Sequence, residues 1–89
     1  MEHKALYEAI LKLETIEECH NFFEDIATKK ELNDFSDRLN VATLLLEGKT
    51  YDTINKETLI SSATIARVNR ALTYGTGGYK HIINKQKED

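Results

Sequence analysis

The stretch TYDTINKETLISSATIARVNRAL, residues 50–72, predicts two short helices joined by a tight turn. Four apolar residues stand at the inward positions that hold two such helices at a steep crossing angle: Ile54, Ile60, Ile65 and Val68. Ser61 or Ser62 can accept a hydrogen bond from a free amide of the next turn and so cap the second helix. This pattern is the outline of a helix-turn-helix, whose second helix enters a DNA major groove.

The turn itself departs from the usual motif at two positions. Asn55 stands where a small alanine usually allows close helix packing, and Leu59 stands where glycine usually makes the turn. A leucine at a position that requires positive φ carries strain, so we expect a variant turn. The alternative is an ordinary helical hairpin, because many such hairpins have the same spacing.

Helical periodicity on both sides of the motif predicts an all-α chain. Before the motif, helices are expected over residues 3–13, 15–27 and 29–47, the last stopped by Gly48. Two of them open with capping boxes, Thr15 with Glu18 and Thr28 with Glu31. The third is apolar nearly all round and is therefore expected to be buried on several sides.

After the motif, the sequence TYGTGGYK breaks the second helix at its glycines. A phosphate-cradling loop is the alternative, but no strand precedes the glycines and no Lys-Ser/Thr follows them. A short helix is expected over residues 79–86. The predicted organisation is one domain over residues 1–89, with dimerisation helices in 1–48 and the helix-turn-helix in 50–74.

Composition fits one small helical domain. The chain has 89 residues, of which 40% are apolar, and it lacks proline. A domain of this size forms a thin core and often gains burial by dimerising. Its single cysteine, Cys19, excludes an internal disulfide. No apolar run approaches the length of a membrane span and no signal peptide opens the chain, so we expect a cytoplasmic protein.

The net charge of −3 is unevenly distributed along the chain. Residues 1–59 hold seven Lys and Arg against thirteen Asp and Glu, whereas residues 60–89 hold five against two. The basic part contains the second motif helix. Because phosphate attraction is local and screened within about 10 Å in salt, this asymmetry favours DNA binding more than the total suggests.

No catalytic or metal-binding pattern is present. The three histidines, His3, His20 and His81, lack metal-ligand spacing, and no nucleophile stands beside a base. The sequence therefore predicts neither an enzyme nor a metal site.

The run DRLNVATLLLEGKTYDTINKETLISSATIARVNRAL, residues 37–72, resembles the core of the Trp repressor family. The resemblance is carried by Leu45-Leu46-Glu47-Gly48 at the end of the long helix and by Thr64-Ile65-Ala66-Arg67 in the second motif helix. It extends over about residues 30–75 and is closest to the YerC/YecD branch of the family. It implies a Trp-repressor-like, intertwined helical homodimer with two DNA-reading heads.

The resemblance also implies an effector site. Arg38 and Arg67 match the family arginines that hold the amino-acid corepressor. The segment TYGTGG departs from the tryptophan-binding pattern, so the effector stays open between tryptophan, another amino acid and none. No other cofactor is implied.

The residues expected to contact DNA follow from the motif. Those facing the groove are Ser61, Ser62, Ala63 and Ala66, with Thr64 reaching a base or a phosphate. Arg67 and Arg70 are candidates for guanine or phosphate, because guanidinium binds in a bidentate manner. The DNA backbone would be held by Lys49, Thr50, Lys56 and Lys80, although each lysine could equally be a solvated surface charge.

These observations lead to two hypotheses. The first is a sequence-specific DNA-binding transcriptional regulator, acting as a homodimeric repressor of amino-acid metabolism genes with an amino-acid corepressor. The second is a helical protein-protein interaction module that does not bind DNA.

Overall fold

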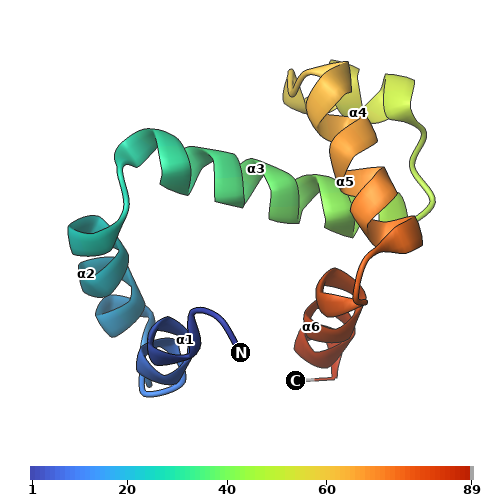
Figure 1. The fold of residues 1–89 in the computed structure, drawn as a ribbon. Coiled ribbons are helices and arrows are strands. Elements are labelled where there is room, and N and C mark those ends of the chain that lie inside the picture. The colour runs from blue at the N-terminus through green and yellow to red at the C-terminus, as the bar shows by residue number, and fades with distance from the viewer. Residues whose placement is uncertain (89) are drawn as a thin grey trace. The chain divides into compact units, whose positions relative to one another are not determined.

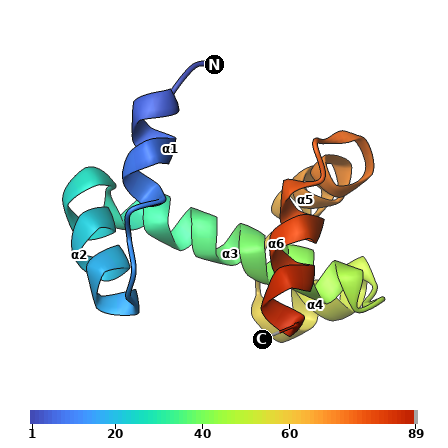
Figure 2. The ribbon, with the colours of Figure 1, turned by 90° about the horizontal axis from the view of Figure 1, so that it is seen from below.

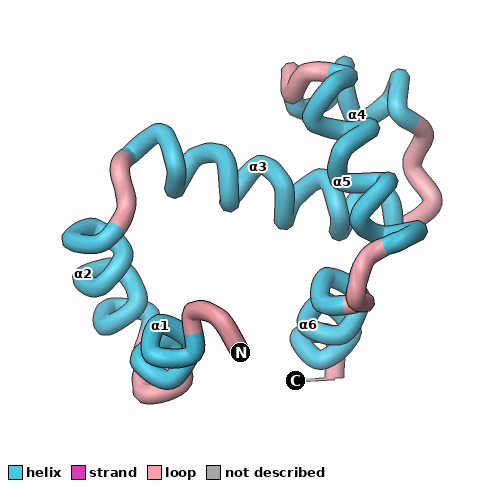
Figure 3. The backbone as a smooth tube through the Cα atoms, in the orientation of Figure 1, coloured by secondary structure: helices cyan, strands magenta, loops and turns pink. Residues whose placement is uncertain are grey.

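Helices joined by short loops make up the part of the chain that the structure describes, residues 1–88 of a computed structural model (Figures 1 and 3). The helices are α1 (Lys4–Ile10), α2 (Ile16–Ile26), α3 (Lys29–Leu46), α4 (Tyr51–Thr58), α5 (Ser62–Tyr74) and α6 (Gly78–Lys87). The all-α prediction is confirmed. Within the described residues, none of these helices is long and apolar enough to cross a membrane. The chain divides into two compact units, residues 1–33 and a second unit that begins at Asp34.

The first unit begins its helices as the sequence predicts. The Thr15 hydroxyl accepts a hydrogen bond from the Glu18 amide at 3.0 Å and caps α2. At the start of α3, Thr28 and Glu31 exchange both bonds of a capping box, at 3.1 and 2.9 Å. At α2 the return bond differs from the prediction, because the Glu18 carboxylate accepts from the amide of Glu14. Neither α1 nor α2 contains a buried residue.

Helix α3 ends at Leu46, close to the predicted stop. Gly48 has φ 88°, and the amide of Lys49 donates to the Leu44 carbonyl at 3.1 Å, which closes the helix end. The expectation of burial on several sides holds only toward the end of this helix, where Leu44, Leu45 and Leu46 are partly buried against the core. Val41 and Ala42 are its fully buried residues, whereas Phe35 and Leu39 are 48% and 38% exposed.

The core of the second unit is formed by six buried residues: Val41, Ala42, Ile54, Ile65, Val68 and Ile83. They come from α3, α4, α5 and α6, which Figure 2 shows from below. Three of the four predicted inward residues of the motif are therefore buried, and the fourth, Ile60, is half-buried and packs against this core. Burial of the inward face fixes α4 against α5.

The glycines after α5 act as the sequence predicts. Gly75 follows the last residue of α5, and Gly77, with φ 86°, precedes α6. Helix α6 begins one residue earlier than expected, at Gly78, and ends one residue later. It is anchored by Ile83, whereas the neighbouring Ile82 stays 46% exposed.

Candidate nucleic-acid interface

Helix α5 has one buried face and one exposed face. Ile65 and Val68 point into the core. The exposed residues lie at the spacing of a single helical face: Ser62, Ala63, Ala66, Arg67, Arg70, Thr73 and Tyr74. The helix therefore presents to solvent the residues that the sequence predicts to meet DNA.

The start of α5 is capped in the way the motif requires. The Ser61 hydroxyl accepts a hydrogen bond from the Thr64 amide at 3.2 Å and donates to the Thr64 hydroxyl at 3.1 Å. Of the two serines considered, Ser61 is thus the cap, and Ser62 is the first residue of the helix. Thr64 is half-buried and engaged in this cap, which makes its hydroxyl less accessible than the other predicted contacts.

Four of the predicted DNA contacts come together in a shallow hollow of about 250 Å³, lined by Ala63, Ala66, Arg67 and Arg70. The two alanines leave space between the two longer side chains. Both guanidinium groups are exposed, and neither has a carboxylate partner among residues 1–88. They can therefore reach an external acceptor such as guanine or phosphate.

The segment of sequence that contains this hollow is basic. No acidic residue occurs between Glu57 and Glu88, whereas this segment contains Arg67, Arg70, Lys80, Lys85 and Lys87. Helices α5 and α6 therefore carry only positive side-chain charge. Phosphate groups are attracted to such a surface independently of their sequence.

The remaining predicted backbone contacts differ in their surroundings. Thr50 caps α4, its hydroxyl accepting from the Thr53 amide and donating to the Thr53 hydroxyl. Lys56 forms an exposed ion pair with Asp52 at 3.0 Å, which lowers the net charge it can offer to phosphate. Lys49, before α4, and Lys80, in the first turn of α6, are exposed.

The two residues expected to hold an effector lie on different helices. Arg67 lines the hollow on α5. Arg38, on α3, is half-buried with its guanidinium 5.9 Å from the centre of the Phe35 ring, and it lines neither this hollow nor the cavity described next.

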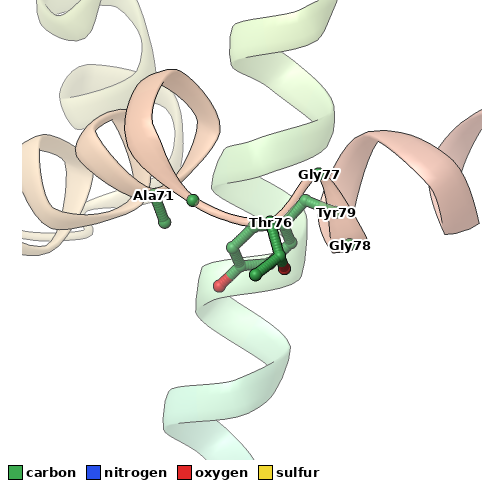
Figure 4. Close-up of a pocket in the computed structure, with 6 residues that line it drawn as sticks. Ala71, Thr76, Gly77, Gly78 and Tyr79 are labelled. Atoms are coloured by element: carbon green, nitrogen blue, oxygen red, sulfur yellow. The ribbon is translucent and has the colours of Figure 1, made fainter.

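A second cavity, of about 410 Å³, lies where α5 meets α6 (Figure 4). Its lining consists of Ala71, Gly75, Thr76, Gly77, Gly78 and Tyr79, so no charged side chain takes part. Tyr79 also packs against the core of the second unit. The cavity offers apolar surface and backbone groups, but no side-chain charge for an amino acid's own ionic groups.

The turn of the motif is held by side-chain hydrogen bonds that the sequence pattern does not predict. Leu59 has φ 62° and ψ 14°, so the turn keeps the positive φ for which glycine is usual, and the expectation of a variant turn is wrong for the backbone. The Asn55 side chain donates to the Ile60 carbonyl at 2.8 Å, and the Thr58 hydroxyl accepts from the Ile60 amide at 3.1 Å. The sequence does show an asparagine at position 55, where a small residue is usual. It does not show which atom the Asn55 side chain bonds, because that depends on the shape of the turn.

The chain matches known proteins along nearly its whole length. The family model of the Trp repressor protein matches residues 1–87. The uncharacterized protein YerC of Bacillus subtilis is 45% identical over 83 residues, covering 93% of this chain and 80% of that protein.

Solved structures agree with this match. A protein of Staphylococcus aureus, provisionally described as a Trp repressor, superposes with a TM-score of 0.90 and is 42% identical, covering 96% of this chain and 85% of that one. A TrpR-like protein of Eubacterium eligens gives the same TM-score and identity over 94% of this chain and 87% of that one. Together with the helix-turn-helix, these matches establish that the chain belongs to the Trp repressor family, a family of DNA-binding regulators.

Proposed function

We propose that this protein is a cytoplasmic, homodimeric transcription repressor that reads a specific DNA sequence with α5. The observation that carries the proposal is the division of α5 into two faces. Ile65 and Val68 hold the helix on the core, and the opposite face presents Arg67 and Arg70 without carboxylate partners in the described chain. A capped helix held in this way can lie in a major groove with its N-terminal residues at the base edges.

The residues that line the hollow on α5 suit recognition of thymine and guanine in the major groove. Ala63 and Ala66 offer a small apolar surface that suits the methyl group of thymine. Arg67 and Arg70 flank it and suit the two acceptors on the major-groove edge of guanine. We therefore expect a half-site with thymine beside guanine. Replacing that thymine by deoxyuridine should weaken binding about fourfold, the value of one buried methyl group.

A homodimer is supported by apolar residues that the single chain leaves exposed. In the first unit, Leu11 and Ile16 are 83% and 89% exposed. Apolar surface on this scale is typical of a chain that associates. A dimer would place two α5 helices on half-sites about 34 Å apart, so the operator is expected to be a palindrome.

An amino-acid corepressor is part of the proposal and rests on Arg38 and Arg67, the residues that match the family pattern. A free amino acid carries a carboxylate, and a guanidinium is a suitable bidentate partner for it. Control of amino-acid metabolism genes would follow from such a corepressor. The test is a thermal shift with each of the twenty amino acids, followed by operator affinity with and without any that stabilise the protein. A corepressor should raise both the melting temperature and the operator affinity. If none of the twenty amino acids changes either quantity, the proposed corepressor is contradicted.

DNA binding is tested by selection of genomic fragments with the purified full-length protein, with and without an amino-acid mixture. Recovery of a palindrome supports the proposal, and dependence on the mixture supports a corepressor. Arg67→Ala is expected to weaken operator binding about tenfold or more and to reduce the salt slope by about one unit. The matched control is Lys12→Ala, which removes an exposed positive charge of the first unit and should leave affinity unchanged.

The competing hypothesis makes the opposite prediction. A helical interaction module would enrich no duplex under either condition, and Arg67→Ala and Lys12→Ala would behave alike in every DNA assay. That result would contradict the proposed function.

A further inference from the structure

The turn between α4 and α5 holds a residue in a conformation that its side chain disfavours. Leu59 lies in the left-handed region at φ 62°, where the Cβ of an L-residue is crowded and glycine is relaxed. The leucine side chain is 86% exposed, so burial does not compensate for this conformation. Some other interaction must hold the turn.

Two side chains of α4 supply that interaction, and we name Asn55 and Thr58 the turn clamp. Asn55 Nδ2 donates to the Ile60 carbonyl at 2.8 Å. The Thr58 hydroxyl accepts from the Ile60 amide at 3.1 Å and donates to the Ile54 carbonyl at 2.6 Å. Both backbone polar groups of Ile60 are therefore fixed to α4.

Ile60 is the residue that connects the turn to α5. The next residue, Ser61, caps α5, and Ser62 and Ala63 begin its exposed face. Any rotation at Ile60 would therefore displace the residues nearest the base edges. Because base-edge hydrogen bonds tolerate displacements of only about 0.5 Å, the position of Ile60 decides whether they form.

We propose that Asn55 and Thr58 are positioning residues for DNA reading, which hold the start of α5 in register by balancing the strain at Leu59. The inference rests on the proposed function. It predicts that loss of the clamp impairs specific binding, whereas attraction to any duplex persists because the basic side chains of α5 and α6 remain. It also predicts that removing the strain makes the clamp dispensable.

The experiment compares Asn55→Ala alone with the double variants Asn55→Ala/Leu59→Gly and Asn55→Ala/Leu59→Ala. Both changes at Leu59 delete an exposed side chain, but only glycine relieves the left-handed conformation. Affinity is measured by fluorescence anisotropy for the selected operator and for an unrelated duplex, at a temperature where circular dichroism reports every variant folded.

Asn55→Ala should weaken operator binding about tenfold, and its affinity for the unrelated duplex should change less than about threefold. The glycine double variant should return to within about threefold of the parent, and the alanine double variant should not. If Asn55→Ala does not remain folded, Thr58→Val, which keeps the side-chain shape, is compared with its Leu59→Gly and Leu59→Ala partners in the same way.

Three outcomes overturn the inference. The first is that the folded single variant, Asn55→Ala or Thr58→Val, keeps the parent's preference for operator. The second is that glycine and alanine at position 59 rescue this preference equally, and the third is that neither rescues it. Failure of the parent protein to prefer any duplex is a separate result, visible before a variant is made, and it removes the proposed function together with this inference.

Discussion

The two units of this chain use their apolar residues in opposite ways. In the unit that begins at Asp34, the inward residues Ile54 and Ile65 are fully buried. In residues 1–33 no helix position is buried in α1 or α2, and Ile16 on α2 remains 89% exposed. Both stretches have clear helical periodicity. A regular apolar pattern therefore predicts a helix in each, but it does not decide whether the same chain buries the apolar face of that helix.

The largest expected effect on stability comes from the buried core of the second unit. Ile65→Ala should lower the free energy of unfolding by about 2–5 kcal/mol, because the side chain is fully buried and its removal leaves a cavity. Ile82→Ala, at a 46% exposed position, is the matched control and should cost about 1 kcal/mol or less. Urea denaturation measures both. Equal losses would mean that the core is not centred on Ile65.

The exposed apolar residues of the first unit are expected to matter for self-association of the chain. Ile16→Asp should weaken self-association about tenfold or more, because it places a charge on apolar surface that a second copy would cover. A carboxylate in the first turn of α2 favours the helix, so helix loss would not explain the effect. Sedimentation equilibrium measures the change. Leu59→Asp, which alters an equally apolar and 86% exposed residue outside the first unit, is the control.

Gly75, which follows α5, and Gly78, the first residue of α6, form a matched pair of glycines within the second unit. A Cβ built at Gly75 would lie 2.4 Å from the Ala71 carbonyl oxygen, whereas one at Gly78 meets only the Thr76 hydroxyl at 3.8 Å. Gly75→Ala should therefore destabilise the protein by about 1–3 kcal/mol. Gly78→Ala, in the first turn of a helix, should be neutral or slightly stabilising. A destabilising Gly78→Ala with a silent Gly75→Ala would contradict the geometry of this junction.

The smallest effects are expected at the helix caps, one in each unit. Thr15→Ala and Ser61→Ala each remove a hydroxyl that accepts a helix amide, and each should cost about 1 kcal/mol. Thermal unfolding followed by circular dichroism measures the two variants. Only Ser61→Ala is also expected to weaken operator binding, because its helix is the proposed reading helix. If Thr15→Ala lost more operator affinity than Ser61→Ala, the proposal that the second unit reads DNA would be contradicted.

Much of the local structure follows from the sequence because its causes are local. A cap at Thr28 requires only Glu31, three residues away, and Gly48 ends α3 because it adopts positive φ without a clash. The inward residues of the motif are set by the helical period. The exposed face of α5, with Arg67 and Arg70, follows from the same period.

What the sequence by itself determined is therefore the order of helices, most of their ends and the face of α5 offered to a partner. Only the tertiary structure decided which apolar stripe of α3 is buried, because Val41 packs in the core of the second unit whereas Phe35 stays 48% exposed. It also decided that a leucine could replace glycine in the turn. That outcome depends on Asn55 and Thr58 meeting Ile60, and such a meeting requires the folded turn that brings their atoms together.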